Sequence, residues 1–282
     1  MLYKFLKTNH FILNHPVLKV LVYANVFIAL CSVAQVLANY KLFHIPFNYA
    51  NSSYVVFVLL STFLQYNVQR GYMIDATNIN TERSQWIILH KKTLMISIGV
   101  CLITVLFLCN NLSWLSIGIM VGAEVLSTLY YLPAINLRKQ GYIKPFLVSF
   151  VWVISCSAVP LIENHLISSS TIYFLISQFF FIGMLCVLFD VKDAETDYLQ
   201  GINTYANKFG FLFTKLLAIA LIALQLGFLY LSGFLFLHLL PILLLSALSV
   251  MVILLCSDKK HAFFYYLIVD GLLLVQYVLF LL

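Results

Sequence analysis

Charged residues are scarce in this chain. Asp, Glu, Lys and Arg together make up 9% of its 282 residues, whereas water-soluble domains carry about 25%. Apolar residues make up 63%, too many for the core of a water-soluble globule of this size. The sequence therefore predicts an integral membrane protein of the all-α class.

Paired cysteines and basic stripes are missing as well. The six cysteines stand singly in apolar runs without a C-x-x-C pair, so neither a zinc site nor a disulfide framework is indicated. The net charge of +6 comes from scattered residues, which argues against nucleic acid as a partner. The first apolar run, 17–38, lacks a small-residue cleavage site, so we expect a retained helix rather than a signal peptide.

Apolar runs that are long enough to cross a bilayer as a helix, about 17–25 residues, occur nine times. The expected spans are 17–39, 53–70, 94–110, 113–132, 145–162, 171–190, 212–231, 234–256 and 263–282. Long polar loops are expected at 71–93, 133–144 and 191–211. Because the spans use nearly the whole chain, we expect one domain over residues 1–282.

The distribution of basic residues predicts the orientation, because Lys and Arg accumulate on the cytoplasmic side of membrane proteins. With nine spans and a cytoplasmic N-terminus, fifteen of the sixteen Lys and Arg residues fall on the cytoplasmic side and only Lys41 falls outside. We therefore expect a multi-pass protein with its N-terminus in the cytoplasm and its C-terminus outside, in the plasma membrane if the source is bacterial.

An acidic segment follows the expected span 171–190. On a helix, Asp190, Asp193 and Asp197 share one face because positions i, i+3 and i+7 lie within about 60° of one another, whereas Glu195 points elsewhere. Three like charges near a helix C-terminus repel one another and oppose the helix dipole. The spacing therefore favours a divalent cation such as Mg²⁺, which carboxylates and substrate phosphates hold together. A solvated acidic helix end is the alternative.

A weaker polar row follows the expected span 53–70. Asn67, Gly71 and Asp75 stand at i, i+4 and i+8, but Asp75 is the only carboxylate of the row. An ordinary interfacial loop anchored by Trp86 is the alternative. Both polar segments end even-numbered helices on the same side, which predicts that they face each other.

These motifs resemble those of the UbiA superfamily of intramembrane prenyltransferases. The resemblance rests on nine helices, a polar motif after the second, a Tyr-Leu-Pro turn with basic residues after the fourth, and D-x-x-D-x-x-x-D after the sixth. It continues into the Gly201–Thr204 stretch and then Gly210, and it spans most of the chain. It implies a helical bundle around a central cavity that opens to the cytoplasmic side.

The resemblance also implies a function: transfer of a polyprenyl group from its diphosphate to an acceptor, with Mg²⁺ held by two acidic loops. Asp190, Asp193 and Asp197 would be the metal ligands, and Asn67 and Asp75 would supply the remains of the second set. The family pattern after the second helix is N-D-x-x-D-x-x-x-D, but Val68 and Gly71 replace its two leading aspartates. We therefore expect one Mg²⁺ ion rather than two.

Basic and aromatic residues complete the expected substrate site. Phosphate oxygens accept charge-assisted bonds from Arg and Lys, and the candidates are Arg70, Arg138, Lys144 and Lys192; positive-inside topology is the alternative explanation for each. Tyr131, beside Tyr130, is a candidate to stabilise a prenyl carbocation through the face of its ring; an interfacial belt residue is the alternative. Glu124 lies inside a span, where a carboxylate marks a functional site or a bond to a neighbouring helix.

Three functions remain open at this point. The first is a prenyltransferase that uses a polyprenyl diphosphate and an acceptor which the sequence does not identify. The second is an inactive homologue that binds lipids or assists assembly. The third is a small-solute transporter, supported only by Glu124 and Asp270 inside spans.

The topology is testable by cysteine labelling in a cysteine-free background. Single cysteines at Ser52 and Ser169 are expected to react with an impermeant thiol reagent applied from outside, because both positions lie in loops on the side that carries only one of the sixteen Lys and Arg residues, Lys41. Labelling of a cysteine at Asn203 from the outside would contradict the orientation.

Overall fold

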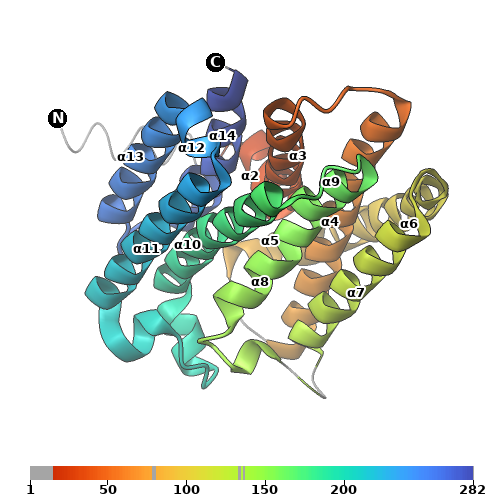
Figure 1. Cartoon of the computed structure of the whole chain (residues 1–282). Coiled ribbons are helices and arrows are strands. Elements are labelled where there is room, and N and C mark those ends of the chain that lie inside the picture. The colour runs from red at the N-terminus through yellow and green to blue at the C-terminus, as the bar shows by residue number, and fades with distance from the viewer. Residues whose placement is uncertain (1–14, 78–80, 133–134, 136, 282) are drawn as a thin grey trace.

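The computed structural model describes residues 15–77, 81–132, 135 and 137–281, except the side chains of residues 72–77. These residues form a helical bundle without strands (Figure 1). The α-helices are α2 (Pro16–Tyr23), α3 (Val26–Leu42), α4 (Tyr49–Thr77), α5 (Glu82–Leu89), α6 (Lys91–Leu108), α7 (Trp114–Tyr131), α8 (Lys144–Val153), α9 (Val159–Glu163), α10 (Ser169–Leu199), α11 (Tyr205–Ser232), α12 (Phe234–Leu237), α13 (Leu239–Leu255) and α14 (Gly271–Leu281). Short 3₁₀ segments are η1 (Cys109–Asn111) and η2 (Leu137–Lys139), and π-helical segments are η3 (Ile154–Ala158) and η4 (Phe264–Val269).

Within the described part of the chain, six helical segments are long and apolar enough to cross a membrane, and the bent pair α2 and α3 would make a seventh. The six are Lys91–Asn111, Trp114–Tyr131, Lys144–Glu163, Ser169–Leu199, Tyr205–Ser232 and Phe264–Leu281. Each of the nine expected spans falls on a helical segment. The multi-pass architecture is thus supported, while the number nine stays a prediction.

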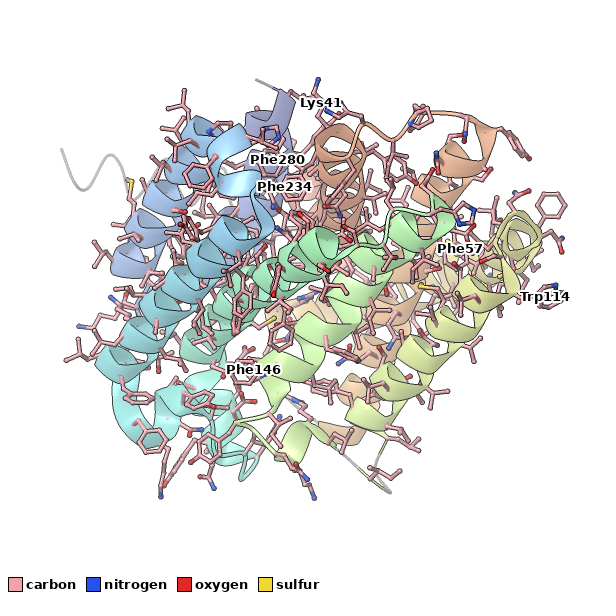
Figure 2. The ribbon with its side chains drawn as sticks, viewed as in Figure 1. Lys41, Phe57, Trp114, Phe146, Phe234 and Phe280 are labelled. Atoms are coloured by element: carbon pink, nitrogen blue, oxygen red, sulfur yellow. The ribbon has the colours of Figure 1, made fainter. Side chains whose placement is uncertain are left out.

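The outer surface of the bundle is strongly apolar. Ile103 and Phe107 of α6 are exposed, and Trp114 at the start of α7 has 89% of its surface exposed. Trp114 projects away from the bundle in Figure 2. Such a continuous exposed apolar surface marks an interaction with lipid or protein, which fits a protein embedded in a bilayer.

Polar side chains join helices inside the bundle, and α10 is the most deeply buried of the candidate spans. Gln276 Nε2 of α14 donates to Gln178 Oε1 of α10 at 3.0 Å. Asn39 Nδ2 of α3 donates to the carbonyl oxygen of Cys156 in η3 at 2.8 Å. In lipid, where association has no hydrophobic driving force, such interhelical bonds help to specify which helices pack together.

The prediction of a long loop over 71–93 is wrong, because most of this segment is helical. α4 continues to Thr77, and α5 begins at Glu82, capped by Thr81, after residues 78–80, which lie outside the described part. Lys19 Nζ of α2 lies 2.7 Å from Glu82 Oε1 at the start of α5, and this hydrogen bond lowers the pKa of Glu82. The loop expected at 191–211 is likewise mostly helical, since α10 continues to Leu199. Polar residues such as Gln, Lys, Arg and Glu end an apolar run without ending a helix.

The expected first span, 17–39, is two helices. α2 and α3 meet at a bend of 63°, and Asn25 between them has a φ of 60°. Asn is among the few residues that adopt this left-handed conformation with little penalty. The bend therefore has a local cause in the sequence, and Asn67 supports it from α4 as described below.

The three connections expected to be polar lie together. The ends of α4, α7 and α10 and the turn between α10 and α11 are at one end of the bundle, the lower end in Figure 1. Lys41 lies at the opposite end, as Figure 2 shows. The structure thus places the polar segments on one side as expected, and the assignment of that side to the cytoplasm stays a prediction.

The connections after α7 and α10 are in backbone contact. A Cβ atom at Gly141 would lie 2.2 Å from the carbonyl oxygen of Asn203 and 3.1 Å from Ile202 Cγ2. Only a residue without a side chain allows the two segments to approach so closely. The contact holds the start of α8 next to the end of α10.

Gly141→Ala is therefore expected to lower the free energy of unfolding by about 1–3 kcal/mol, the usual cost of overpacking. Thermal unfolding of the detergent-solubilised protein measures this change. Gly118→Ala is the control, because a Cβ atom there meets nothing within 4 Å. Equal unfolding temperatures for the two variants would contradict the backbone contact.

Candidate functional site

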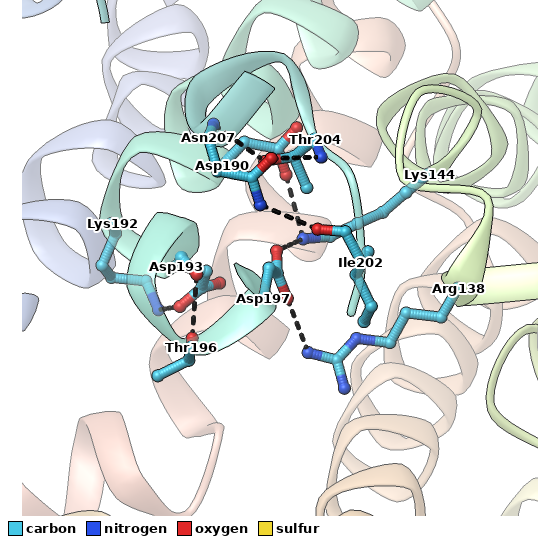
Figure 3. A network of polar contacts seen from close by, with 10 residues as sticks. All are labelled: Arg138, Lys144, Asp190, Lys192, Asp193, Thr196, Asp197, Ile202, Thr204 and Asn207. Carbon is cyan, nitrogen blue, oxygen red and sulfur yellow. Dashed lines mark hydrogen bonds and ion pairs between the residues drawn. The ribbon is translucent and has the colours of Figure 1, made fainter. Parts of the chain in front are cut away.

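The acidic segment forms the last turns of α10, and a tight turn connects it to α11. Ile202 N donates to the carbonyl oxygen of Asp197 at 2.8 Å, and Asn207 Nδ2 donates to the carbonyl oxygen of Ile202 at 2.7 Å. Thr204 caps α11 reciprocally with Asn207. These bonds satisfy backbone groups that a helix end leaves free and fix the position of the turn; Figure 3 draws those that Asn207 makes with Ile202 and Thr204.

Lys144, the first residue of α8, lies between two of the three aspartates (Figure 3). Its Nζ atom is 2.9 Å from Asp190 Oδ1 and 2.8 Å from Asp197 Oδ2. Both carboxylates have 0% of their surface exposed. The ammonium therefore bridges two fully buried anions.

Arg138 completes this cluster. Its guanidinium nitrogen Nη2 lies 3.1 Å from Asp197 Oδ1, and its side chain is 15% exposed. Asp190 and Asp197 are thus matched by Lys144 and Arg138, so two negative and two positive charges cancel. Burial of ionised carboxylates requires such pairing.

Asp193 is separate from this cluster. Its Oδ1 lies 2.5 Å from Lys192 Nζ, and the same ammonium is 3.3 Å from the hydroxyl of Tyr266. Glu195 is exposed, off the face of the aspartates as expected. The three aspartates therefore divide into a buried pair and a third carboxylate that faces a cavity.

That cavity has a volume of about 250 Å³ and lies among α3, α4, α7, α8, α10 and the α14 region. Apolar and aromatic side chains such as Ile28, Val148 and Leu185 form much of its wall. Trp152 Nε1 donates to the hydroxyl of Tyr66 at 3.1 Å, and both rings line the cavity. The cavity is a candidate for the expected substrate chamber, whose opening toward the cytoplasm stays a prediction.

Four cations line the same cavity: Arg70, Arg83, Lys144 and Lys192. Arg83 Nη2 donates to Asn25 Oδ1 at 2.5 Å, and its guanidinium lies 4.9 Å from the ring centre of Tyr266. Arg70 makes no ion pair with a carboxylate among the described side chains. Two carboxylates, Asp193 and Asp270, line the cavity as well, so an anionic group placed there would meet more cations than carboxylates.

The polar row of α4 is divided between two surfaces. Asn67 Nδ2 donates to the carbonyl oxygen of Ala24 at 3.0 Å, and its Oδ1 accepts from Asn25 Nδ2 at 3.1 Å. It thus supports the bend between α2 and α3. Residues of α4 that line the cavity are instead Gln65, Tyr66, Gln69 and Arg70. The side chain of Asp75 lies outside the described residues.

The remaining predicted site residues lie farther from the cluster. Tyr131 ends α7, and its neighbour Tyr130 is the one that lines the cavity. Glu124 lines a smaller hollow of about 70 Å³, which shares Tyr66 and Trp152 with the cavity wall. The roles assigned to Tyr131 and Glu124 stay predictions.

Two residues that line the cavity, Arg83 and Tyr266, were not assigned to the site from the sequence. Arg83 stands in a polar stretch before the aromatic anchor Trp86 and counts toward the topology. Asp270 was a candidate functional residue because its carboxylate lies inside an apolar run, and it lines the cavity. Tyr266 lies four residues before Asp270, and this one-turn spacing would have indicated a polar helix face.

The described side chains do not fit the expected three-aspartate Mg²⁺ site. Among them, no three His, Cys, Asp or Glu residues gather closely enough to hold a metal ion. Asp190 and Asp197 do converge, but they converge on an ammonium. The single Mg²⁺ ion expected from the sequence stays a prediction.

One comparison with known proteins, with solved structures, supports the fold. No protein-family model matches the chain, and no curated protein sequence matches it. A solved structure of a digeranylgeranylglyceryl phosphate synthase in membranes is similar over 93% of this chain and 96% of that one, with a TM-score of 0.58 and 16% identity. The chain has the fold of this synthase. This likeness supports the all-helical membrane architecture expected from the sequence.

Asp197→Asn is expected to lower the free energy of unfolding by about 3–5 kcal/mol, because it leaves two buried cations with a single carboxylate. Chemical or thermal unfolding in detergent measures the change. Glu195→Gln, which alters an exposed carboxylate on the same helix, is expected to stay within about 0.5 kcal/mol of the wild type. Equal losses in both variants would mean that a general acidic helix end, rather than the cluster, stabilises this region.

Proposed function

We propose that this chain is an intramembrane prenyltransferase that acts on a polyprenyl diphosphate. The observation that carries the proposal is the cavity, in which cations line the same space as a long apolar wall. An amphiphile with an anionic head and an apolar tail matches both parts. Likeness in fold to a membrane prenyltransferase supports this class of ligand.

The ligand is expected to lie with its diphosphate at Arg70, Arg83 and Lys192. Arginine binds phosphate oxygens in a bidentate manner, and Arg70 has no ion pair to break among the described side chains. The prenyl chain would extend along Val148, Leu185 and their apolar neighbours. In a bilayer such a chain is already out of water, so its binding is favoured by van der Waals packing against this wall rather than by the hydrophobic effect.

The proposed reaction breaks the bond between the allylic carbon and the diphosphate oxygen. The bonding electrons leave with the diphosphate, whose developing negative charge the arginine and lysine side chains stabilise. Tyr66, Tyr130 and Trp152 line the cavity and offer aromatic faces to the resulting carbocation. An acceptor of lipid type then donates an electron pair to that carbon and loses a proton.

A second function, binding of an isoprenoid without catalysis, is favoured by one observation. Asn67 stands where the sequence pattern expects a metal-motif residue, but its side-chain amide is hydrogen-bonded to Ala24 and Asn25 at the bend between α2 and α3. Val68 and Gly71 replace carboxylates in the same motif. A protein that kept the cavity and lost transfer would show these features. Transport has no comparable support.

Binding of a prenyl diphosphate analogue can be measured by the fluorescence of Trp152, which lines the cavity. In a Trp86→Phe, Trp114→Phe background it is the only tryptophan of the chain. A non-hydrolysable prenyl thiodiphosphate is expected to change its fluorescence on binding. Arg70→Gln should weaken this binding by about 10- to 100-fold, because a charge-assisted hydrogen bond contributes about 1.5–3 kcal/mol.

Lys139→Gln is the matched control, since Lys139 is an exposed cation at the same end of the bundle. Its affinity for the analogue is expected to match the wild type. Release of diphosphate from a labelled prenyl diphosphate, measured with several acceptor classes, separates the two functions. Binding without release would favour the non-catalytic protein, and absence of binding would refute both.

A further inference from the structure

The position between Asp190 and Asp197 is already filled by a positive charge. The two residues are seven positions apart, two turns of α10, and their carboxylates converge on one atom, Lys144 Nζ. Two buried carboxylates that face one point at this distance are an arrangement that also suits a divalent cation. In this chain the ammonium of Lys144 lies at that point.

The ammonium is held there by the fold rather than by chance rotation of a side chain. Lys144 begins α8 and is followed by Pro145, whose ring restricts the first turn of the helix. The preceding segment is fixed by the backbone contact of Gly141 with Asn203. The side chain of Lys144 is 12% exposed and borders the cavity. Lys144 is therefore directed into the cluster by both flanking segments.

Charge balance argues for the same conclusion. With Lys144 and Arg138 in place the cluster is neutral. A divalent ion added to it would leave a buried excess of two positive charges. A divalent ion that displaced Lys144 would instead leave an ammonium without a partner in a mostly buried position, which is costly.

We propose that Lys144 is a built-in cation that takes the place of a divalent metal ion between Asp190 and Asp197, so that the chain binds an anionic headgroup without a metal at this position. The proposal rests on the proposed function for the identity of the headgroup, a prenyl diphosphate. An ammonium has three N–H donors. Lys144 Nζ donates one to Asp197 Oδ2 and is ion-paired with Asp190, which leaves a donor for a ligand in the cavity that Lys144 borders. Lys144 is thus a positioning residue for the carboxylates and a binding residue for the ligand.

The first test requires no prenyl ligand. Mn²⁺ is titrated into the full-length protein in lipid nanodiscs and bound ions are counted by electron paramagnetic resonance. The wild type and the control Lys139→Met are expected to bind no Mn²⁺ that depends on Asp190, whereas Lys144→Met is expected to gain one ion that a second change, Asp190→Asn, removes. The gain would follow from two carboxylates left without their ammonium.

Two results of this titration would overturn the proposal. One is stoichiometric binding of Mn²⁺ by the wild type that Asp190→Asn or Asp197→Asn abolishes. The other is a folded Lys144→Met protein that takes up no Mn²⁺. If Lys144→Met does not fold, Lys144→Arg keeps the charge, and this variant and the wild type are both expected to bind no Mn²⁺.

The second test measures the prenyl thiodiphosphate through Trp152 fluorescence, with EDTA and with Mg²⁺. Affinities that agree within about threefold, less than 0.7 kcal/mol, support the proposal, and Mg²⁺ dependence of tenfold or more overturns it. Absence of binding in both conditions would refute the proposed function instead. The Mn²⁺ titration would still decide the role of Lys144, so the two failures are distinguishable.

Discussion

Burial of two carboxylates at the end of α10 is the constraint on which this end of the bundle depends. Asp190 and Asp197 have no exposed surface, and an unpaired carboxylate in such a position would cost several kcal/mol. Their partners come from one short stretch of chain: Arg138 lies in the connection between α7 and α8, and Lys144 is the first residue of α8. The two aspartates of α10 can therefore stay ionised and buried only when that connection is folded against them.

The geometry of the connection follows from this pairing. Gly141 lies between the two cations in sequence and touches the backbone of Asn203, so the chain crosses close to the turn after α10. That turn is fixed in its own right by Ile202, Thr204 and Asn207. A rigid turn on one side and a side-chain-free contact on the other allow a lysine and an arginine to reach the same aspartate. The cavity borders the cluster at Lys144 and is also lined by Lys192 and Asp193 of α10.

Much of the helical architecture could be predicted from the sequence, because apolar runs of membrane-spanning length are a strong signal. The common face of Asp190 and Asp197 was also predictable from helical spacing. What spacing does not give is the neighbour that meets the face: Lys144 is distant in sequence and reaches it through a loop contact. Helix ends were misplaced for a different reason, since hydropathy changes where the lipid ends and hydrogen bonding continues beyond that point.

The row of α4 illustrates a further limit. Asn67 matched the first position of a metal motif in sequence, yet its amide is engaged with Ala24 and Asn25 at the bend of the first helical pair. The cavity wall uses the neighbouring positions, Tyr66 and Arg70, a rotation of one residue around the helix. A motif defines a periodicity, whereas the direction in which it faces depends on how the helix packs.

Replacement of a metal ion by an ammonium would have a chemical consequence for either proposed function. A divalent ion concentrates two charges and acts as a Lewis acid on the leaving oxygen, whereas an ammonium supplies one charge and directional N–H donors. A site built on Lys144 therefore has less power to drive ionisation and equal power to orient an anionic head. Arg70, Arg83 and Lys192 around the same cavity supply further positive charge without any metal. Their contribution to bond cleavage is set by their distance from the departing oxygen, because electrostatic stabilisation acts at the atom where charge develops.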